Sequence, residues 1–282
     1  MTREALHRII QRKEIPAAEK DGALYEVTGF KDMNELIDGF APGSGDSLSL
    51  GAALSGYTLL SPIVHPRQDI MCLGINYSDH AEEAGKFSKE AFGGERPYTI
   101  YFAKRCSEAI GPGALIPSYP GYVDSLDYEV ELGVVLGKDA KNVKPAEALK
   151  YVFGYTVFND ISARNLQTRH KQWYVGKSLD GFTAMGPCIV TPDELGDIYA
   201  LGIRCFVNGE LRQKSITSRM IQTIEGAIAD LTQGITLKAG TVIAMGTPSG
   251  VGMGMDPPTF LKPGDVVRCE IDGIGVLENT VG

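Results

Sequence analysis

The sequence has little that a membrane-spanning or secreted protein would need. None of its apolar stretches reaches the roughly 20 residues that cross a bilayer. The N-terminal segment "MTREALHRIIQRKEIP" carries charges throughout and has no apolar centre typical of a secretory signal. The formal net charge is −8, from 27 basic and 35 acidic residues, and no basic run stands out. We therefore expect neither a membrane nor a nucleic acid as partner.

Cysteines are few and widely spaced. The 282-residue chain has five, and no two form a CxxC pair: Cys72, Cys106, Cys188, Cys205 and Cys269. An odd, scattered set does not favour a disulfide framework or a thiolate zinc site. The expectation is a reduced, cytoplasmic protein.

Nucleotide-binding motifs are missing as well. The loop "MGTPSGVGMGMDPP", residues 245–258, is rich in glycine but lacks the GK[ST] of a P-loop. Its spacing is wrong for a Rossmann turn, and Pro257 and Pro258 forbid a following helix. The glycines instead favour close approach of the backbone to a ligand, to which Thr247 could offer a hydroxyl and an amide.

The chain predicts a small N-terminal domain, residues 1–65, and a main domain, residues 66–282. A short helix is expected over residues 2–13, with three apolar side chains on one side and Pro16 ending it. Asp32 and Glu35 form a capping box that predicts a second short helix. Residues 41–56 are rich in glycine and serine and are expected to be a loop or linker.

From about residue 57 the pattern is mainly β. Short β-type runs punctuated by glycine and proline include "DIMCLGI", "YTIYFA", "YEVELGVVL", "YVFGYTVFN" and "GTVIAMG". Helices are expected from Ser78 through "DHAEEAG" and over "SITSRMIQTIEGAIADLTQG", residues 215–234. Residues 85–97 fit either a mobile flap or an ordinary surface loop. The predicted class is α+β, mainly β.

A row of acids interrupts one apolar strand. In "SLDYEVELGVVLG", residues 125–137, the acids Asp127, Glu129 and Glu131 are spaced two apart, so on a strand they share one face. A solvated strand face is the common explanation, since charged side chains are mostly exposed. The strongly apolar flanks favour a central strand instead.

A fourth acid points to a metal. "YTVFNDISARN" ends a second strand at Asp160. Glu129, Glu131 and Asp160 would form a compact all-oxygen cluster that repels itself unless a cation is present. Three carboxylates leave about half of an octahedral Mg²⁺ or Mn²⁺ shell open to water and substrate. Zinc is the weaker candidate, because no Cys or His is nearby in sequence.

Further polar residues suggest proton chemistry. If a helix begins near Ser78, His80 and Glu83 lie at i and i+3, and the carboxylate can make the imidazole a general base for water. An ordinary helix start explains the same residues. Lys104 and Lys177 each close a β-like segment and could stabilise developing negative charge, although most lysines are merely solvated.

Taken together, the segments resemble the fumarylacetoacetate hydrolase family. The resemblance runs from about Asp69 to the C-terminus. It rests on the order and spacing of "CLGINYSDHAEE", "YFAKR", "DYEVELGVVLGKDAKNV", "GYTVFNDISARNLQ", "GKSLDGFTAMGPCIVTPDEL", "VNGELRQ" and "GTPSGVGMG". It implies a mixed β-roll with a small N-terminal extension, and a homodimer.

The resemblance also implies three groups of site residues. The ligands of Mg²⁺, Mn²⁺ or Ca²⁺ would be Glu129, Glu131 and Asp160. The catalytic group, a water-activating dyad and an oxyanion-stabilising lysine, would be His80, Glu83 and Lys177. The substrate-contacting group would be Tyr77, Lys104, Arg164, Gln167 and Thr247.

The implied activity is metal-dependent hydrolysis of a C–C bond in an acylpyruvate or a related 2-oxo (di)acid, through a metal-bound enolate. Decarboxylation of an oxaloacetate-type acid and isomerisation of a 2-hydroxydienedioate pass through the same enolate, so the sequence leaves both open. A dianionic substrate would need a second cation, for which Arg105, Lys104 and Arg164 are candidates. A metal-stabilised binding module without turnover is the alternative of another class.

Overall fold

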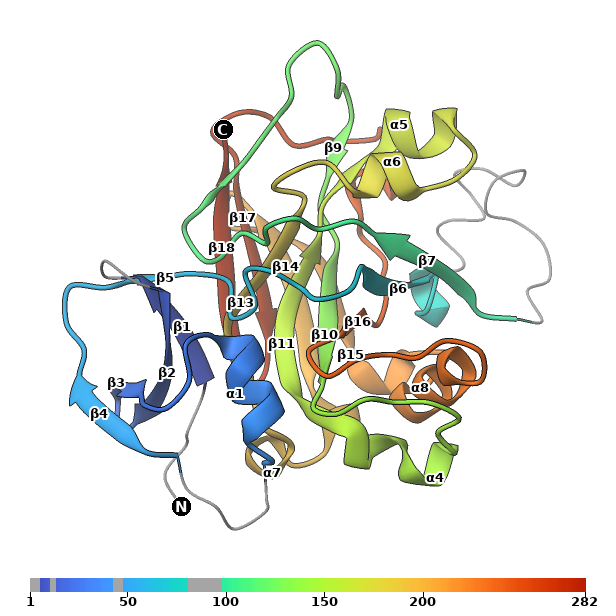
Figure 1. Cartoon of the computed structure of the whole chain (residues 1–282). Helices are drawn as coiled ribbons and strands as arrows, with labels where there is room; N and C mark the ends of the chain where they lie inside the picture. The colour runs from blue at the N-terminus through green and yellow to red at the C-terminus, as the bar shows by residue number, and fades with distance from the viewer. Residues whose placement is uncertain (1–5, 11–13, 43–47, 81–97) are drawn as a thin grey trace.

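The computed structural model describes residues 6–10, 14–42, 48–80 and 98–282 (Figure 1). The largest of its sheets has 11 strands. Ten of them follow the spatial order β4 (Leu50–Ala53), β3 (Ala23–Val27), β2 (Glu14–Lys20), β1 (Leu6–Ile10), β13 (Thr183–Val190), β11 (Val152–Asp160), β10 (Val130–Leu136), β16 (Val242–Ala244), β6 (Ile70–Gly74) and β7 (Ile100–Lys104). The remaining strand, β5 (Thr58–Leu59), pairs with β1.

Two smaller sheets complete the β structure. The five-stranded sheet has the order β15 (Glu210–Ile216), β14 (Gly202–Val207), β17 (Val266–Ile271), β18 (Gly275–Val281) and β8 (Leu115–Ile116). The two-stranded sheet pairs β12 (Ser162–Ala163) with β9 (Leu126–Asp127). The strands are mostly antiparallel, but β16 runs parallel to β6 and β18 runs parallel to β8.

The helices of the described chain are short. The α-helices are α1 (Met33–Gly39), α4 (Pro145–Ala148), α5 (Arg164–Arg169), α6 (Tyr174–Lys177), α7 (Pro192–Leu195) and α8 (Ile224–Thr232). The 3₁₀ turns are η1 (Leu149–Tyr151), η2 (Ile198–Ala200), η3 (Thr217–Arg219) and η4 (Gly252–Gly254). None of the described helices is long and apolar enough to cross a membrane.

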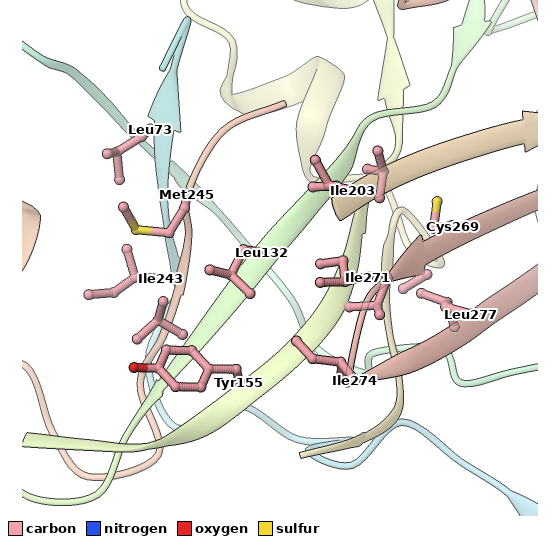
Figure 2. Close-up of a cluster of buried hydrophobic side chains, with 14 of the residues drawn as sticks. Leu73, Leu132, Tyr155, Ile203, Ile243, Met245, Cys269, Ile271, Ile274 and Leu277 are labelled. Carbon is pink, nitrogen blue, oxygen red and sulfur yellow. The ribbon is translucent and has the colours of Figure 1, made fainter. Parts of the chain in front are cut away.

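The central strands β10 and β11 are buried on both faces. One face packs against the five-stranded sheet: Leu132 and Tyr155 gather with Ile203, Ile271 and Leu277 in one apolar core (Figure 2). The other face contributes to a second core together with the buried side of α1. Strands covered on both sides are continuously apolar, which explains "VELGVVL" and "VFGYTVFN". A charged side chain on such a strand needs a buried partner.

The N-terminal strands extend the large sheet at the left of Figure 1, where β1 pairs antiparallel with β13. The prediction of a helix over residues 2–13 is therefore wrong for residues 6–10, which form β1 between β2, β5 and β13. Three apolar residues at i, i+3 and i+4 fit a helix, but a short run does not separate helix from strand, and here three neighbouring strands decide.

Two further expectations are corrected. Residues 50–53 of the expected 41–56 loop form β4, paired with β3. Of the expected helix over residues 215–234, only Ile224–Thr232 is α-helical. Residues 215–216 end β15 instead, and the Thr223 hydroxyl caps α8 by accepting from the Gly226 N–H at 3.0 Å. The predicted helix is too long because the apolar spacing continues through residues that precede this cap.

Other expectations hold. The Asp32 carboxylate accepts from the Glu35 N–H at 2.9 Å and starts α1, as the capping box predicts. Residues 78–80 are helical, while the rest of the helix predicted there and the segment 85–97 lie outside the described residues. The mainly β, α+β class is confirmed. The division of the chain near residue 65 stays a prediction.

Candidate active site

Three buried acids meet where β10 and β11 run side by side. Glu131 lies on β10, Asp160 ends β11, and Glu129 sits in the short break between β9 and β10. Each of the three offers one oxygen such that all three oxygens lie within 4.8 Å of one another. Their exposed fractions are 6%, 1% and 0% for Glu129, Glu131 and Asp160. The sequence prediction that these three acids come together is supported by this geometry.

The strand break gives Asp127 a different place from its neighbours. Val130 pairs with Asn159 in the β10–β11 ladder, while Asp127 pairs with Ser162 in the separate β9–β12 ladder. At the break, the Asn159 side chain accepts from the Glu129 N–H at 3.1 Å. Asp127 is not among the three clustered acids. The simple alternation that places all three acids of the row together therefore holds for two of them.

Fixed cations flank two of the clustered acids. The Lys177 Nζ donates to Glu129 Oε2 at 2.8 Å and to Asp160 Oδ2 at 2.6 Å. The Lys104 Nζ contacts Asp160 Oδ1 and also donates to two backbone carbonyls. Arg164 Nη1 lies 2.7 Å from Glu129 Oε1. Burial alone would raise the pKa of Glu129, but the charges of Lys177 and Arg164 hold it below its usual range.

Glu131 is the clustered acid that no described cation contacts. Its Oε2 accepts from the Gly246 N–H at 2.7 Å. Burial and the negative charges of Asp160 and Glu129 raise the pKa of Glu131 well above its usual value. Four buried carboxylates, Asp127 included, face three buried lysine and arginine side chains, one fewer than the acids. An all-oxygen donor set with fewer such partners than acids fits a hard divalent cation.

The cluster borders a narrow cavity. The cavity volume is about 30 Å³. The lining includes an apolar wall of Leu73, Ile75, Phe102, Trp173, Val251 and Met253. The polar lining comes from His80, Glu129, Glu131, Arg164, Gln167, Lys177 and Thr247. A concave cavity that combines apolar side chains with several polar groups is typical of a small-molecule site.

Most of the predicted site residues described here reach this cavity: His80, Lys177, Arg164, Gln167 and Thr247 join the glutamates. Lys104 and Tyr77 do not line it. Lys104 is fully buried and contacts Asp160, and the Tyr77 hydroxyl is buried with no hydrogen-bond partner among the described residues. Burial, with the charges of Glu131 and Asp79, raises the pKa of Tyr77. Glu83 lies outside the described residues.

Sequence reasoning missed two supporting side chains. The Gln213 amide accepts from the Val130 N–H at 3.0 Å and donates to the Thr247 hydroxyl at 2.8 Å, so it ties the ligand strand to the glycine-rich loop. The Asn76 amide donates to Met245 O at 2.7 Å and holds the segment before His80. Gln213 is the last residue of "VNGELRQ", a segment whose sequence alone gives no sign of this role.

Comparisons with known proteins find relatives over most of the chain. Residues 69–282 match the family model for the fumarylacetoacetate (FAA) hydrolase C-terminal domain. Oxaloacetate tautomerase YisK of Bacillus subtilis (strain 168) is 45% identical over 230 residues, 82% of this chain and 75% of that protein. The solved fumarylacetoacetate hydrolase of Exiguobacterium antarcticum covers 99% of both chains, with a TM-score of 0.85 and 36% identity.

A second solved structure, the 2-hydroxyhepta-2,4-diene-1,7-dioate isomerase of Mycobacterium marinum, covers 100% of this chain and 98% of its own, with a TM-score of 0.77 and 27% identity. These matches are to enzymes, and the described residues include a buried carboxylate cluster that could hold a divalent cation. The chain belongs to the fumarylacetoacetate hydrolase family. The resemblance drawn from the sequence motifs, and the family fold it implies, are thereby confirmed.

Proposed function

We propose that this protein is a divalent-metal-dependent enzyme that interconverts the enol and keto forms of a small 2-oxo diacid of the oxaloacetate type. The observation that carries the proposal is the buried cluster of Glu129, Glu131 and Asp160, of which Glu131 contacts no described cation, at the edge of a narrow cavity. The Bacillus relative, which bears the name oxaloacetate tautomerase, supports the choice of reaction.

Glu129, Glu131 and Asp160 would hold Mg²⁺ or Mn²⁺, and Ca²⁺ suits the same oxygen donors. When bound, the metal would supply Lewis acidity toward the oxygens of a 2-oxo acid. The three acids are held in place without it: backbone pairing fixes their strands, and Lys104 and Lys177 fix the Asp160 carboxylate from two sides.

Lys177 stabilises the negative charge that grows on the substrate oxygen when a proton leaves C3. An ammonium group has three N–H donors, and two of those of Lys177 are used by Glu129 and Asp160. Burial opposes its charge, but Asp160 and Glu129 raise the pKa of Lys177, so it remains a cation. A fixed cation at the developing charge lowers the barrier without reorganisation.

His80 lines the cavity and is the side chain we assign to moving the proton between C3 and solvent. Gln167 and Thr247 orient the substrate. The Gln167 carbonyl accepts from Arg164 Nη1 at 3.0 Å, which leaves its amide N–H groups for a substrate oxygen. Glu83 as partner of His80, and substrate contacts of Lys104 and Tyr77, stay predictions.

Hydrolysis of an acylpyruvate is the second candidate, and His80 is the observation that favours it. An imidazole at the cavity could activate a water molecule instead of moving a C3 proton. Decarboxylation of oxaloacetate and isomerisation of a dienoic diacid need the same enolate but no attacking water. The products therefore separate these reactions.

The test follows the enol absorbance of freshly dissolved oxaloacetate by stopped flow, with Mg²⁺, Mn²⁺ or EDTA. We expect metal-dependent acceleration, and a drop of about 100-fold or more in Lys177→Met, comparable to the loss of one oxyanion donor. The control variant is Lys150→Met, which removes an exposed lysine paired with Glu147. Separate samples receive acetylpyruvate alone, where acetate and pyruvate detected by NMR report hydrolysis, while pyruvate in the oxaloacetate samples reports loss of CO₂.

Cleavage of acetylpyruvate without acceleration of the tautomerisation would replace the first proposal by the second. No metal-dependent reaction of any of these acids, dienoic diacids included, would favour the binding module without turnover. A homodimer in solution is a separate proposal, which sedimentation equilibrium tests directly.

A further inference from the structure

Asp127 is a fully buried carboxylate next to the site that neither joins the clustered acids nor lines the cavity. Its Oδ1 accepts from the N–H groups of Tyr128 at 2.9 Å and Gly252 at 2.7 Å. Its Oδ2 accepts from Met253 N–H at 3.0 Å and from Arg164 Nε at 2.8 Å. A carboxylate with this many donors is rigidly fixed.

These contacts join two walls of the cavity that are far apart in the sequence. Arg164 begins α5, and Met253 lies in the η4 turn; both residues line the cavity. The approach of η4 to Asp127 requires a glycine at position 252. A Cβ added there would lie 2.7 Å from Asp127 Oδ1 and 2.3 Å from Thr259 O.

The guanidinium of Arg164 is only partly used by the protein. Its Nε donates to Asp127, and its Nη1 contacts Glu129 and Gln167. Its Nη2 is buried and has no hydrogen-bond partner among the described residues. Since buried polar groups are almost always paired, an unpaired donor on a cavity-lining residue indicates an acceptor that the described residues do not supply.

The other two cations considered for a dianionic substrate are occupied or remote. Lys104 donates to Asp160 and to the carbonyls of Ile161 and Phe182, which uses the three N–H groups of an ammonium. The Arg105 side chain is 65% exposed and pairs with Asp69 at 3.3 Å. Of these three cations, Arg164 alone lines the cavity and keeps a free donor.

We propose that Asp127 is a positioning residue. It holds the Arg164 guanidinium so that Nη2 receives the second carboxylate of a dianionic 2-oxo acid. The inference rests on the proposed function for the substrate class. It gives Asp127, the acid of this row that lies outside the cluster, a role distinct from metal binding. Asp127 shares Arg164 with Glu129, so the guanidinium has a single orientation. Dianion selectivity then depends on Asp127 through Arg164.

The experiment compares binding of oxaloacetate with binding of 2-oxobutyrate, a monoanion of the same chain length, by calorimetry of the Mg²⁺-loaded protein. In Asp127→Asn we expect the Kd for oxaloacetate to rise about 30-fold or more, the loss typical of a disrupted buried charge pair. The Kd for 2-oxobutyrate should change less than about 3-fold. Arg164→Lys, which keeps the charge but not the fork, should show the same selective loss.

The control is Asp38→Asn, which breaks the Asp38–Arg67 pair at the base of α1, away from the cavity. It should leave both Kd values unchanged. Equal weakening of both ligands in Asp127→Asn, or an unchanged ratio of the two Kd values in Arg164→Lys, overturns the inference. If Asp127→Asn does not fold, Arg164→Lys decides alone.

Calorimetry with oxaloacetate at its keto–enol equilibrium reports binding whether or not the protein converts the bound acid, so the two proposals can fail separately. A wild-type protein that prefers the dianion but accelerates no reaction refutes the proposed function and leaves the role of Asp127 standing. A third readout separates positioning from plain packing: hydrogen–deuterium exchange at C3 of 2-oxobutyrate, followed by NMR. In both variants the rate of this exchange should fall by a much smaller factor than the affinity for oxaloacetate, and an equal or larger fall would contradict the proposal.

Discussion

Replacing Glu131 by Gln gives the sharpest test of the metal site. The carboxylate is 1% exposed, contacts no described cation and lies against two other acids. In the metal-free protein its charge is therefore unfavourable. Glu131→Gln removes that charge and keeps the shape and the acceptor for the Gly246 N–H. We expect the metal-free variant to be as stable as the wild type or more stable, which is rare for a substitution in a core.

With metal bound, the wild type should instead be more stable than Glu131→Gln. At a metal concentration of 100 times Kd, binding stabilises the wild type by about 2.7 kcal/mol. For a chain of this size that corresponds to a rise in Tm of roughly 5–10 °C. Loss of one anionic ligand should weaken binding at least ~100-fold, because even outer-shell partners contribute 10–100-fold. At the same metal concentration, the variant then gains only about 0.4 kcal/mol, or about 1 °C.

Differential scanning calorimetry with increasing Mg²⁺ or Mn²⁺ measures both quantities. Glu147→Gln is the matched control, because Glu147 is an exposed acid that pairs with Lys150 on the surface. It should retain the full rise in Tm. If Glu131→Gln shows the same metal-induced rise as the wild type, Glu131 is not a ligand. If the wild type shows no rise with any divalent ion, the cluster does not bind a metal.

Three further outcomes follow. Trp173 is the only tryptophan and lines the cavity, so its fluorescence should change when Mg²⁺ and a 2-oxo acid bind, and Trp173→Phe should abolish the signal. Asp32→Ala removes the cap of α1 and should lower the free energy of unfolding by about 1 kcal/mol, measured by urea titration. Lys104→Met should cost about 3–5 kcal/mol without metal, because Asp160 loses a buried partner. Part of that loss should return with Mg²⁺, and an unchanged urea midpoint would show that Lys104 is not needed as a counter-ion.

The parts of the fold that sequence predicts well are those with a strong local signal. The runs that form β10 and β11 are apolar throughout, and strands of that kind are buried on both faces. The Asp32 cap is equally local, because its partner is three residues away. The strand β1 has no such signal. Its pairing with β13 joins residues 6 and 189, and no pattern within residues 2–13 reports a partner that distant.

In the candidate site, too, some residues are predictable from the local sequence and others are not. Carboxylates spaced two apart in an apolar run, with a further acid at the end of the next run, predict from sequence that Glu129, Glu131 and Asp160 come together, and the structure places them together. The lysines are different, because a lysine in a sequence is usually solvated. Only the structure reveals that Lys104 and Lys177 are both buried and that both contact Asp160. Family motifs indicate which lysines matter, but they do not separate a counter-ion from a residue that reaches the cavity.

The acid row itself illustrates the limit of periodicity. Strict alternation places Asp127 beside Glu129 and Glu131, and a fourth carboxylate there would add to the repulsion that already raises the pKa of Glu131. The chain avoids this by ending β9 at Asp127 and starting β10 at Val130. The break turns Asp127 toward Arg164 and the η4 turn, where positive charge and backbone N–H groups satisfy it. Identical spacing thus yields two glutamates in the acidic cluster and one aspartate paired with an arginine, because a two-residue interruption of the ladder changes which neighbours each side chain meets.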